Sequence, residues 1–102
     1  MMPMSQLRFA LGLAQKAGKV ASGDLGVEGA LQNRKAKLLL IAADAAESTK
    51  KNLHSIATRC SVPVYEVLSK AELGLAIGKS PRSSIAILDK NFVIMVEKHM
   101  DK

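Results

Sequence analysis

The stretch Arg34–Ala45, RKAKLLLIAADA, contains the segment that decides the fold. Within it, Leu38–Ala42 is short and apolar at every position, whereas a strand with one wet face would alternate apolar and polar residues. We therefore predict a central strand that is covered on both faces of its sheet. Such a strand needs helices above and below it, so the segment indicates an α/β fold.

Helical and strand patterns alternate in the rest of the chain. Apolar residues recur at helical spacing over Ser5–Ala17. A helix capped by Ser48 and Thr49 is expected to run to about Arg59, and the segment from Pro63 to Leu68 is expected to follow it as a strand. This order predicts a second strand beside the central one.

The last third of the chain continues the alternation. Ser69 and Glu72 have the spacing of a capping box, in which each side chain binds a free backbone amide of the other, so a helix is predicted over Lys70–Ile77. A strand over Ser84–Leu88 and a terminal helix over Asn91–Lys102 should follow. Together the segments predict a single-domain, three-layer α/β/α sandwich with a mostly parallel or mixed sheet of about four strands.

The segment Val20–Leu31, VASGDLGVEGAL, is predicted to be the end of a strand, a tight turn and the start of a helix. At about 100° per residue, Val27, Ala30 and Leu31 share one face of that helix and should pack on the sheet. Leu25 then lies on the outward face.

Two glycines, Gly26 and Gly29, fall in the first turns of this helix, although each glycine in a helix interior costs roughly 1 kcal/mol relative to alanine. One interpretation is functional: a helix N-terminus offers free amides and a partial positive charge, and missing side chains would let a phosphate backbone approach closely. The alternative is that a short, well-packed helix tolerates the glycines. A glycine-rich turn alone does not decide between them.

The composition favours an anionic partner. The chain has 15 Lys and Arg against 9 Asp and Glu, a net charge of +6. Only 3% of its residues are aromatic, so it lacks the stacking platform of single-strand binders, and a folded RNA fits better. No apolar run approaches the ~20 residues of a membrane span. We expect a cytoplasmic protein without a membrane partner.

Several residues that could carry chemistry are better explained by structure. Cys60 is the single cysteine, so no internal disulfide or structural zinc site is expected. His54 and His99 lack the converging partners that metal or catalytic sites need. Asp44 follows the central strand, where α/β enzymes place catalytic groups, but a strand-end Asp is more often a turn or cap residue. We therefore predict no enzyme activity, no metal and no cofactor.

Two motifs, RKAKLLLIAADA and SKAELGLAIGK (Ser69–Lys79), follow the glycine-rich turn in that order. With it they make the chain, roughly Leu7–Asp89, resemble the kink-turn RNA-binding ribosomal protein family, and most closely its bacterial members of the YlxQ type. The resemblance implies an α/β/α sandwich and a non-catalytic RNA binder. It also implies a recognition surface made of the turn Ser22–Gly29 and the loop Lys79–Ser84.

The resemblance breaks at the base-reading positions. In family members that read kink-turns, the turn carries a Gly-x-Asn-Glu pattern with a Lys further along the helix, and these side chains read sheared G·A pairs. This sequence keeps Gly23 but has Leu25 at the Asn position, Gly26 at the Glu position and Gly29 at the Lys position. The resemblance therefore implies RNA binding without the standard base-reading side chains.

We predict a protein that binds structured RNA, above all ribosomal RNA, as a monomer when free, with a ribosomal protein as a second candidate partner. Its basic residues are candidates for phosphate contacts, which give affinity without sequence readout. The alternative is a protein-interaction module that docks on a ribosomal or transcription partner through the Leu25 face. The candidate RNA-binding residues are Lys16, Lys19, Gly23, Asp24, Leu25, Gly26, Glu28, Gly29, Lys35, Lys37, Lys79, Ser80, Pro81, Arg82 and Ser83.

Overall fold

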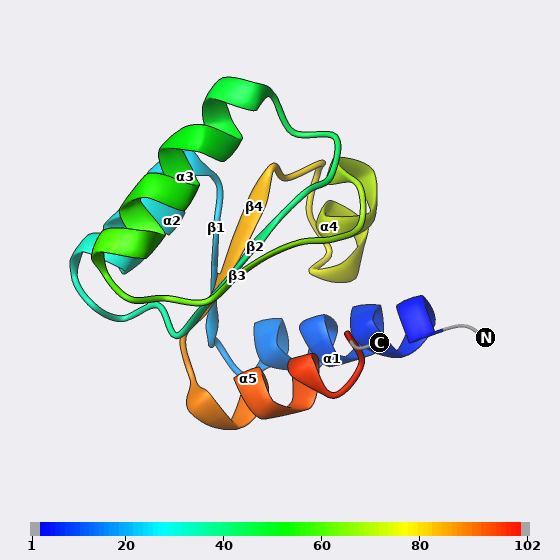
Figure 1. Ribbon diagram of the computed structural model, residues 1–102. Helices are drawn as coiled ribbons and strands as arrows, with labels where there is room; N and C mark the ends of the chain where they lie inside the picture. The colour runs from blue at the N-terminus through cyan, green and yellow to red at the C-terminus, as the bar shows by residue number, and fades with distance from the viewer. Residues whose placement is uncertain (1–2, 101–102) are drawn as a thin grey trace.

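Helices and strands alternate along the chain, as the sequence pattern predicts (Figure 1). The computed structural model describes residues 3–100 of the chain. The elements within that range are α1 (Pro3–Lys16), β1 (Val20–Ser22), α2 (Asp24–Gln32), β2 (Leu38–Ile41), α3 (Glu47–Arg59), β3 (Val64–Glu66), α4 (Lys70–Ala76), β4 (Ser84–Ile87) and α5 (Lys90–Glu97).

The four strands form one mixed sheet in the order β1-β4-β2-β3. β2 and β3 pair in parallel, while β4 is antiparallel to both of its neighbours. The prediction of a mixed sheet is confirmed, and the mostly parallel alternative is wrong. The reason is that the chain after α4 does not add a strand at the edge but returns between β1 and β2.

This strand order brings loops that are far apart in the sequence to the same end of the sheet. Because β1, β2 and β3 point the same way and β4 points the opposite way, the carboxyl ends of three strands and the amino end of β4 share one edge of the sheet. We call it the upper edge, since it lies at the top of Figure 1. The segments that leave or enter the sheet there are Gly23–Asp24, Ala42–Ala46, Val67–Ser69 and Lys79–Ser83.

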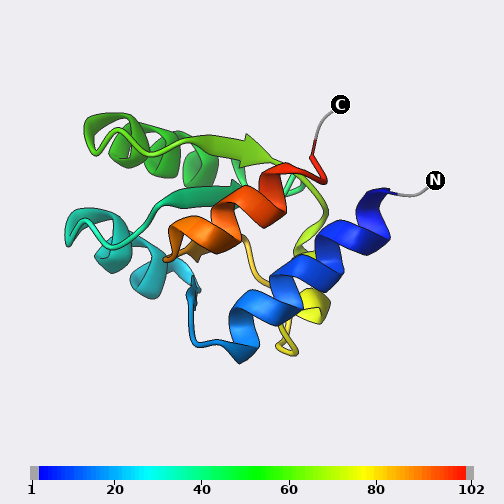
Figure 2. The same cartoon turned by 90° about the horizontal axis from the view of Figure 1, so that it is seen from below.

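The sheet is the middle layer of three. α2 and α3 cover one face, and α1, α4 and α5 cover the other; α1 and α5 lie side by side (Figures 1 and 2). Every residue of β2 and β4 is buried, which confirms the central strand predicted from LLLIA. The helical stripe Val27, Ala30 and Leu31 is buried against the sheet, also as predicted.

The helix caps agree with the sequence in one case and differ in another. The capping box of α4 is confirmed: the Glu72 amide donates to Ser69 Oγ at 3.1 Å, and the Ser69 amide donates to Glu72 Oε1 at 2.9 Å. The cap predicted at Ser48–Thr49 is wrong, because α3 starts earlier. Ala46 is its N-cap, in an extended conformation, and its carbonyl accepts the Lys50 amide.

The terminal helix is shorter than predicted. α5 begins at Lys90, after the N-cap Asp89, whose carboxylate accepts the Asn91 amide at 2.8 Å, and it ends at Glu97. The last two residues of the predicted helix, 101 and 102, lie outside the described residues. None of the described helices is both long and apolar enough to cross a bilayer.

Candidate nucleic-acid interface

The upper edge brings the predicted turn and the predicted loop together. β1 ends at Ser22, directly before the turn, and β4 begins just after the loop Lys79–Ser83. Arg82 Nε donates to Ser22 Oγ at 3.4 Å, and the Ala42 amide donates to the Ser83 carbonyl at 2.8 Å. Two segments about 60 residues apart in sequence therefore form one surface at the end of the sheet.

The N-terminus of α2 is open at this surface. Its N-cap is Gly23, with φ 84° and ψ 155°, a conformation that side-chain-bearing residues rarely adopt. Among the described residues, no side chain accepts a cap hydrogen bond from the first turn. The amides and the partial positive charge of this helix end are therefore available to an anion. The exposed carboxylate of Asp24 would compete with that anion for the amides.

The two glycines of α2 are not required by the fold. Neither Gly26 nor Gly29 has a positive φ, and a Cβ built on either would meet no atom within 4 Å apart from its own helix backbone. Beside them, Leu25 is 86% exposed. The outer side of the first two turns is thus an open strip of backbone with one apolar side chain.

The other charged residue of α2 is already engaged. Asn52 Nδ2 on α3 donates to Glu28 Oε2 at 2.8 Å, so this carboxylate links the two helices that cover one face of the sheet. Glu28 was among the candidate contacts. Its position gives it a second role, in holding α2 against α3.

The loop Lys79–Ser83 is held tightly to α4. The Lys79 amide donates to the Gly74 carbonyl at 2.8 Å, and the Arg82 amide donates to the Lys70 carbonyl at 3.1 Å. A Cβ at Gly74 would lie 2.7 Å from the carbonyl carbon of Ser80 and 2.9 Å from the carbonyl oxygen of Lys79. Only glycine therefore fits at this point of α4.

Within the loop, Arg82 folds back rather than pointing outward. Its Nη1 donates to Ser80 Oγ at 2.7 Å, to the Ser80 carbonyl at 3.2 Å and to the Pro81 carbonyl at 3.3 Å. Together with the contact to Ser22, these bonds fix the loop shape. The exposed Lys79 is the cation of the loop that is presented to solvent.

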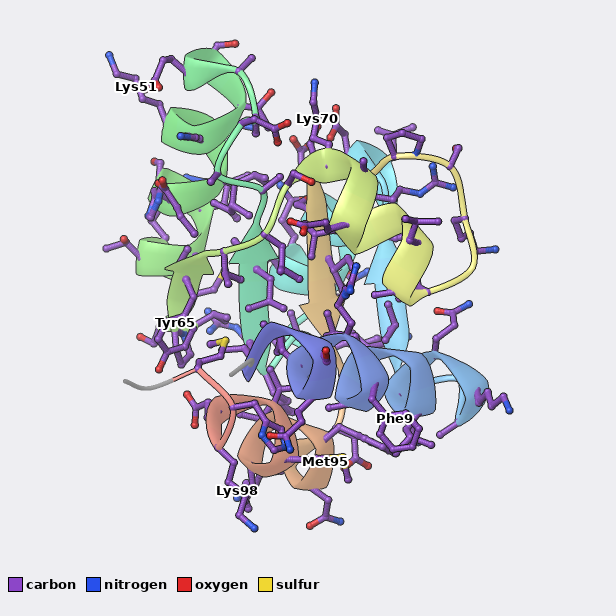
Figure 3. The ribbon with its side chains drawn as sticks, turned by 90° about the vertical axis from the view of Figure 1, so that its right-hand side faces the viewer. Phe9, Lys51, Tyr65, Lys70, Met95 and Lys98 are labelled. Carbon is purple, nitrogen blue, oxygen red and sulfur yellow. The ribbon has the colours of Figure 1, made fainter. Side chains whose placement is uncertain are left out.

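Two further residues of the upper edge come from the neighbouring loops. Asp44 Oδ1 accepts the Lys70 amide at 2.8 Å, which confirms Asp44 as a turn and cap residue. Lys70, half-exposed at the start of α4, lies at the same end of the molecule as the loop (Figure 3). The sequence reasoning did not single out Lys70; its position directly after a capping-box Ser at a strand end was the available signal.

Comparison with known proteins identifies the family of this chain. The sequence pattern of the Ribosomal protein L7Ae/L30e/S12e/Gadd45 family matches residues 5–96. The chain belongs to this family. Two relatives named RNA-binding protein YlxQ are similar to it, from Enterococcus faecium (39% identical, 80% of this chain and 79% of the relative) and Bacillus subtilis (40% identical, 80% and 82%).

A ribosomal protein and a solved structure extend the comparison. A large ribosomal subunit protein of Schizosaccharomyces pombe is 38% identical over 78% of this chain and 69% of its own length. A Bacillus halodurans protein described as having unknown function superimposes with a TM-score of 0.90 at 32% identity, over 95% of this chain and 98% of its own. The prediction of a non-catalytic member of this ribosomal protein family agrees with the named relatives, none of which carries an enzyme name.

The fold separates some residues that the sequence suggested as partners. Lys19 and Lys37 precede β1 and β2, and the Leu88 amide bonds to the Lys19 carbonyl while the Lys37 amide bonds to the Ile87 carbonyl, both at 2.8 Å. These bonds place both lysines at the lower edge, opposite the loop Lys79–Ser83. Lys16 is the last residue of α1, shortly before β1, and Lys35 lies between α2 and β2. A strand of four residues spans about 13 Å, so Lys19 and Lys37 lie about that far from the upper edge.

The outer face of α3 carries a separate polar cluster. His54 Nε2 lies 2.9 Å from Glu66 Oε2, and Lys50 Nζ lies 3.4 Å from Glu66 Oε1. The hydrogen bond with His54, assisted by the Lys50 ammonium, holds the pKa of the Glu66 carboxyl below its ordinary value. Within residues 3–100, no three His, Cys, Asp or Glu side chains converge as metal ligands would.

Proposed function

We propose that this protein binds structured RNA, with ribosomal RNA as its target, through the surface formed by Ser22–Gly29 and Lys79–Ser83. The observation that carries the proposal is the contact of Arg82, in the clamped loop, with Ser22, the residue directly before the open N-cap Gly23 of α2. The RNA-binding and ribosomal names of its relatives support the same reading.

The mechanism is docking of backbone on backbone. Free amides at a helix N-terminus are good hydrogen-bond donors to phosphate, and Gly26 and Gly29 themselves carry no side chain that would keep a phosphate backbone away. Lys79 in the loop is exposed and Lys70 at the start of α4 is half-exposed, and both would add counterion-releasing contacts. Contacts of this kind would position an RNA by its shape, and the exposed Leu25 would touch a base.

Leu25 also keeps the alternative open. A side chain that is 86% exposed on a glycine-flanked helix could fill a pocket of a ribosomal or transcription protein instead of touching a base. On that alternative the positive charge of the chain assists encounter only, and RNA affinity does not depend on the upper edge.

A salt titration separates the two functions. RNA crosslinked to the protein in cells is sequenced, and the recovered fragment is titrated with the free protein, a monomer on this proposal, from about 50 to 200 mM salt. Three to five phosphate contacts predict a log–log slope of about −2 to −4.5. A flat slope, or no binding at low salt, would overturn the RNA proposal and favour the protein-interaction module.

A further inference from the structure

A groove of about 580 Å³ lies between α1 and the C-terminal end of α4, in the helical layer on the other face of the sheet from α2. Its walls include Phe9 and Leu13 of α1 and Leu75 and Ile77 at the end of α4. Phe9 is 69% exposed and Leu75 is 71% exposed. Single exposed apolar residues are ordinary on protein surfaces, but here two large ones share one hollow.

The groove is a product of close helix packing. A Cβ on Gly12 of α1 would lie 3.2 Å from the Ala76 carbonyl oxygen of α4, so the two helices touch at their small residues. The larger side chains on either side of this contact line the groove. Figure 3 shows Phe9 on α1, at some distance from Lys70 and the upper edge. None of the described residues that line the groove belongs to Ser22–Gly29 or Lys79–Ser83, although Gly78 directly precedes that loop.

The charge around the groove has one sign. Arg8 and Lys16 line it, and none of the described residues that line it is an Asp or Glu. α1 itself, Pro3–Lys16, contains these two cations and no acidic residue. Apolar walls flanked by cations complement a segment that combines apolar and acidic side chains.

We propose that this groove docks an acidic amphipathic helix of a protein partner. Two antiparallel or crossing helices with an apolar hollow between them accept a third helix through anchors at i, i+3, i+4 and i+7. α1 is about 21 Å long, which matches a partner helix of three to four turns. Apolar anchors would pack between Phe9 and Leu75, and acidic side chains would face Arg8 and Lys16.

The test begins with a peptide selection that assumes no partner. A library of random 16-residue peptides displayed on phage is selected on the intact protein and counter-selected on the double variant Phe9→Ser/Leu75→Ser. Enriched peptides should be acidic and should place apolar residues at helical spacing. No enrichment, or enrichment of peptides without acidic residues, would overturn the proposal.

The best enriched peptide is then synthesised and titrated by fluorescence anisotropy. Phe9→Ser/Leu75→Ser should weaken its binding at least tenfold, whereas Ile94→Ser, which removes an exposed apolar residue of α5, should change it less than twofold. Arg8→Glu should weaken binding several-fold, and by less at high salt, while Lys98→Glu, at the C-cap of α5, should not weaken it. Circular dichroism checks that each variant is folded.

Two other occupants are separate outcomes of the same experiment. If light scattering finds a dimer that Phe9→Ser/Leu75→Ser converts to a monomer, the groove binds a second copy of this chain and the helix proposal is wrong. If those substitutions weaken binding of the recovered RNA instead of the peptide, the groove is part of the RNA surface. RNA binding that is unchanged by them, together with lost peptide binding, supports two independent sites.

Discussion

The helices α2 and α4 both begin at the upper edge, yet their first turns are built in opposite ways. α4 is closed by side chains: Ser69 and Glu72 form its capping box, and Asp44 accepts the Lys70 amide. α2 begins at Gly23, with no side-chain cap among the described residues. The N-terminus of α4 is capped by side chains of the protein itself, and that of α2 is not capped by any side chain among the described residues.

Their glycines differ in the same sense. Gly74 of α4 lies so close to the backbone of Ser80 that no side chain fits, because the loop Lys79–Ser83 packs on the helix. Gly26 and Gly29 of α2 face open space with ordinary backbone angles. A glycine in a helix therefore has to be judged by what surrounds its Cα: the first supports the fold, and the other two keep a surface bare.

The largest expected effect comes from Gly74→Ala. The added methyl group must displace the backbone of the loop, and overpacking of this kind costs about 1–3 kcal/mol. The free energy of unfolding, measured by urea denaturation, should fall by that amount. RNA affinity should fall as well, since the displaced loop carries Lys79 and Arg82.

Gly26→Ala is the matched control for this prediction. Its methyl group meets no neighbour, and alanine is the better helix former, so the free energy of unfolding should rise by up to about 1 kcal/mol. The comparison between the two helices fails if both substitutions destabilise the protein to the same extent, or if Gly74→Ala has no effect.

The second prediction introduces the side chains that the resemblance to kink-turn readers implies at the base-reading positions. In the triple variant Leu25→Asn/Gly26→Glu/Gly29→Lys, the new side chains extend into solvent, and the loss of two glycines should stabilise the helix by about 1–2 kcal/mol. Affinity for a standard kink-turn oligonucleotide should rise by at least the ~1–3 kcal/mol of one good base contact. Gel-shift titration of both proteins measures the change.

The RNA recovered from cells provides the second half of this test. If bare backbone is what that RNA touches, the triple variant should bind it more weakly than the wild type, because the new side chains obstruct the approach. If the wild-type protein already binds the kink-turn tightly, the interpretation that Leu25, Gly26 and Gly29 replace base-reading side chains is wrong.

The parts of this comparison that the sequence could predict are local. The buried strand Leu38–Ile41, the buried stripe of α2 and the capping box of Ser69 each follow from spacing within a few residues, and the structure confirms them. The two segments of the upper edge came from a family resemblance rather than from spacing. The role of Gly74 was not predictable, because the clashing atoms belong to a loop whose path depends on tertiary packing.

The order of the strands in the sheet could not be predicted from the sequence either, because it also depends on tertiary packing. The insertion of β4 between β1 and β2 decides which strand ends share an edge. In the sequence, Lys19 lies a few residues before the turn, and Lys37 lies beyond the far end of the helix that follows it. A strand separates Lys19 from the turn, and a whole helix separates Lys37 from it. Proximity in sequence therefore does not show which of the candidate lysines lie beside the turn.

The third prediction sharpens the comparison within the loop. Lys79→Ala should weaken binding of all RNAs by a similar factor and make the salt slope shallower by about 1, as expected of one phosphate contact. Arg82→Ala should weaken binding more and also lower the thermal midpoint, because Arg82 holds Ser80 and Ser22. Equal effects of the two substitutions, with no loss of stability, would show that the arginine acts only as a charge.

The smallest expected effect lies outside both helix N-termini, in the cluster of Lys50, His54 and Glu66. The hydrogen bond from His54, followed by the Lys50 ammonium, keeps the pKa of Glu66 below its ordinary value of 4.5. A carboxyl with a lowered pKa in the folded state stabilises the protein above the unfolded value and loses that contribution as the pH falls through the folded value. Glu66→Gln should therefore be slightly less stable than the wild type at pH 7 and equally stable in strong acid.

The measurement is a pair of urea titrations from pH 7 down to pH 2, and its control is the same substitution made in a His54→Ala background. If His54 is the main cause of the lowered pKa, Glu66→Gln should alter the acid dependence much less there, as a double-mutant cycle detects. A difference between the wild type and Glu66→Gln that grows below pH 4 would have the wrong sign. RNA affinity should stay unchanged in all variants of the cycle, because this cluster lies on the outer side of α3 and β3. A parallel loss of RNA binding would mean that the binding surface extends across α3. The comparison of the two helix N-termini would then leave out part of that surface.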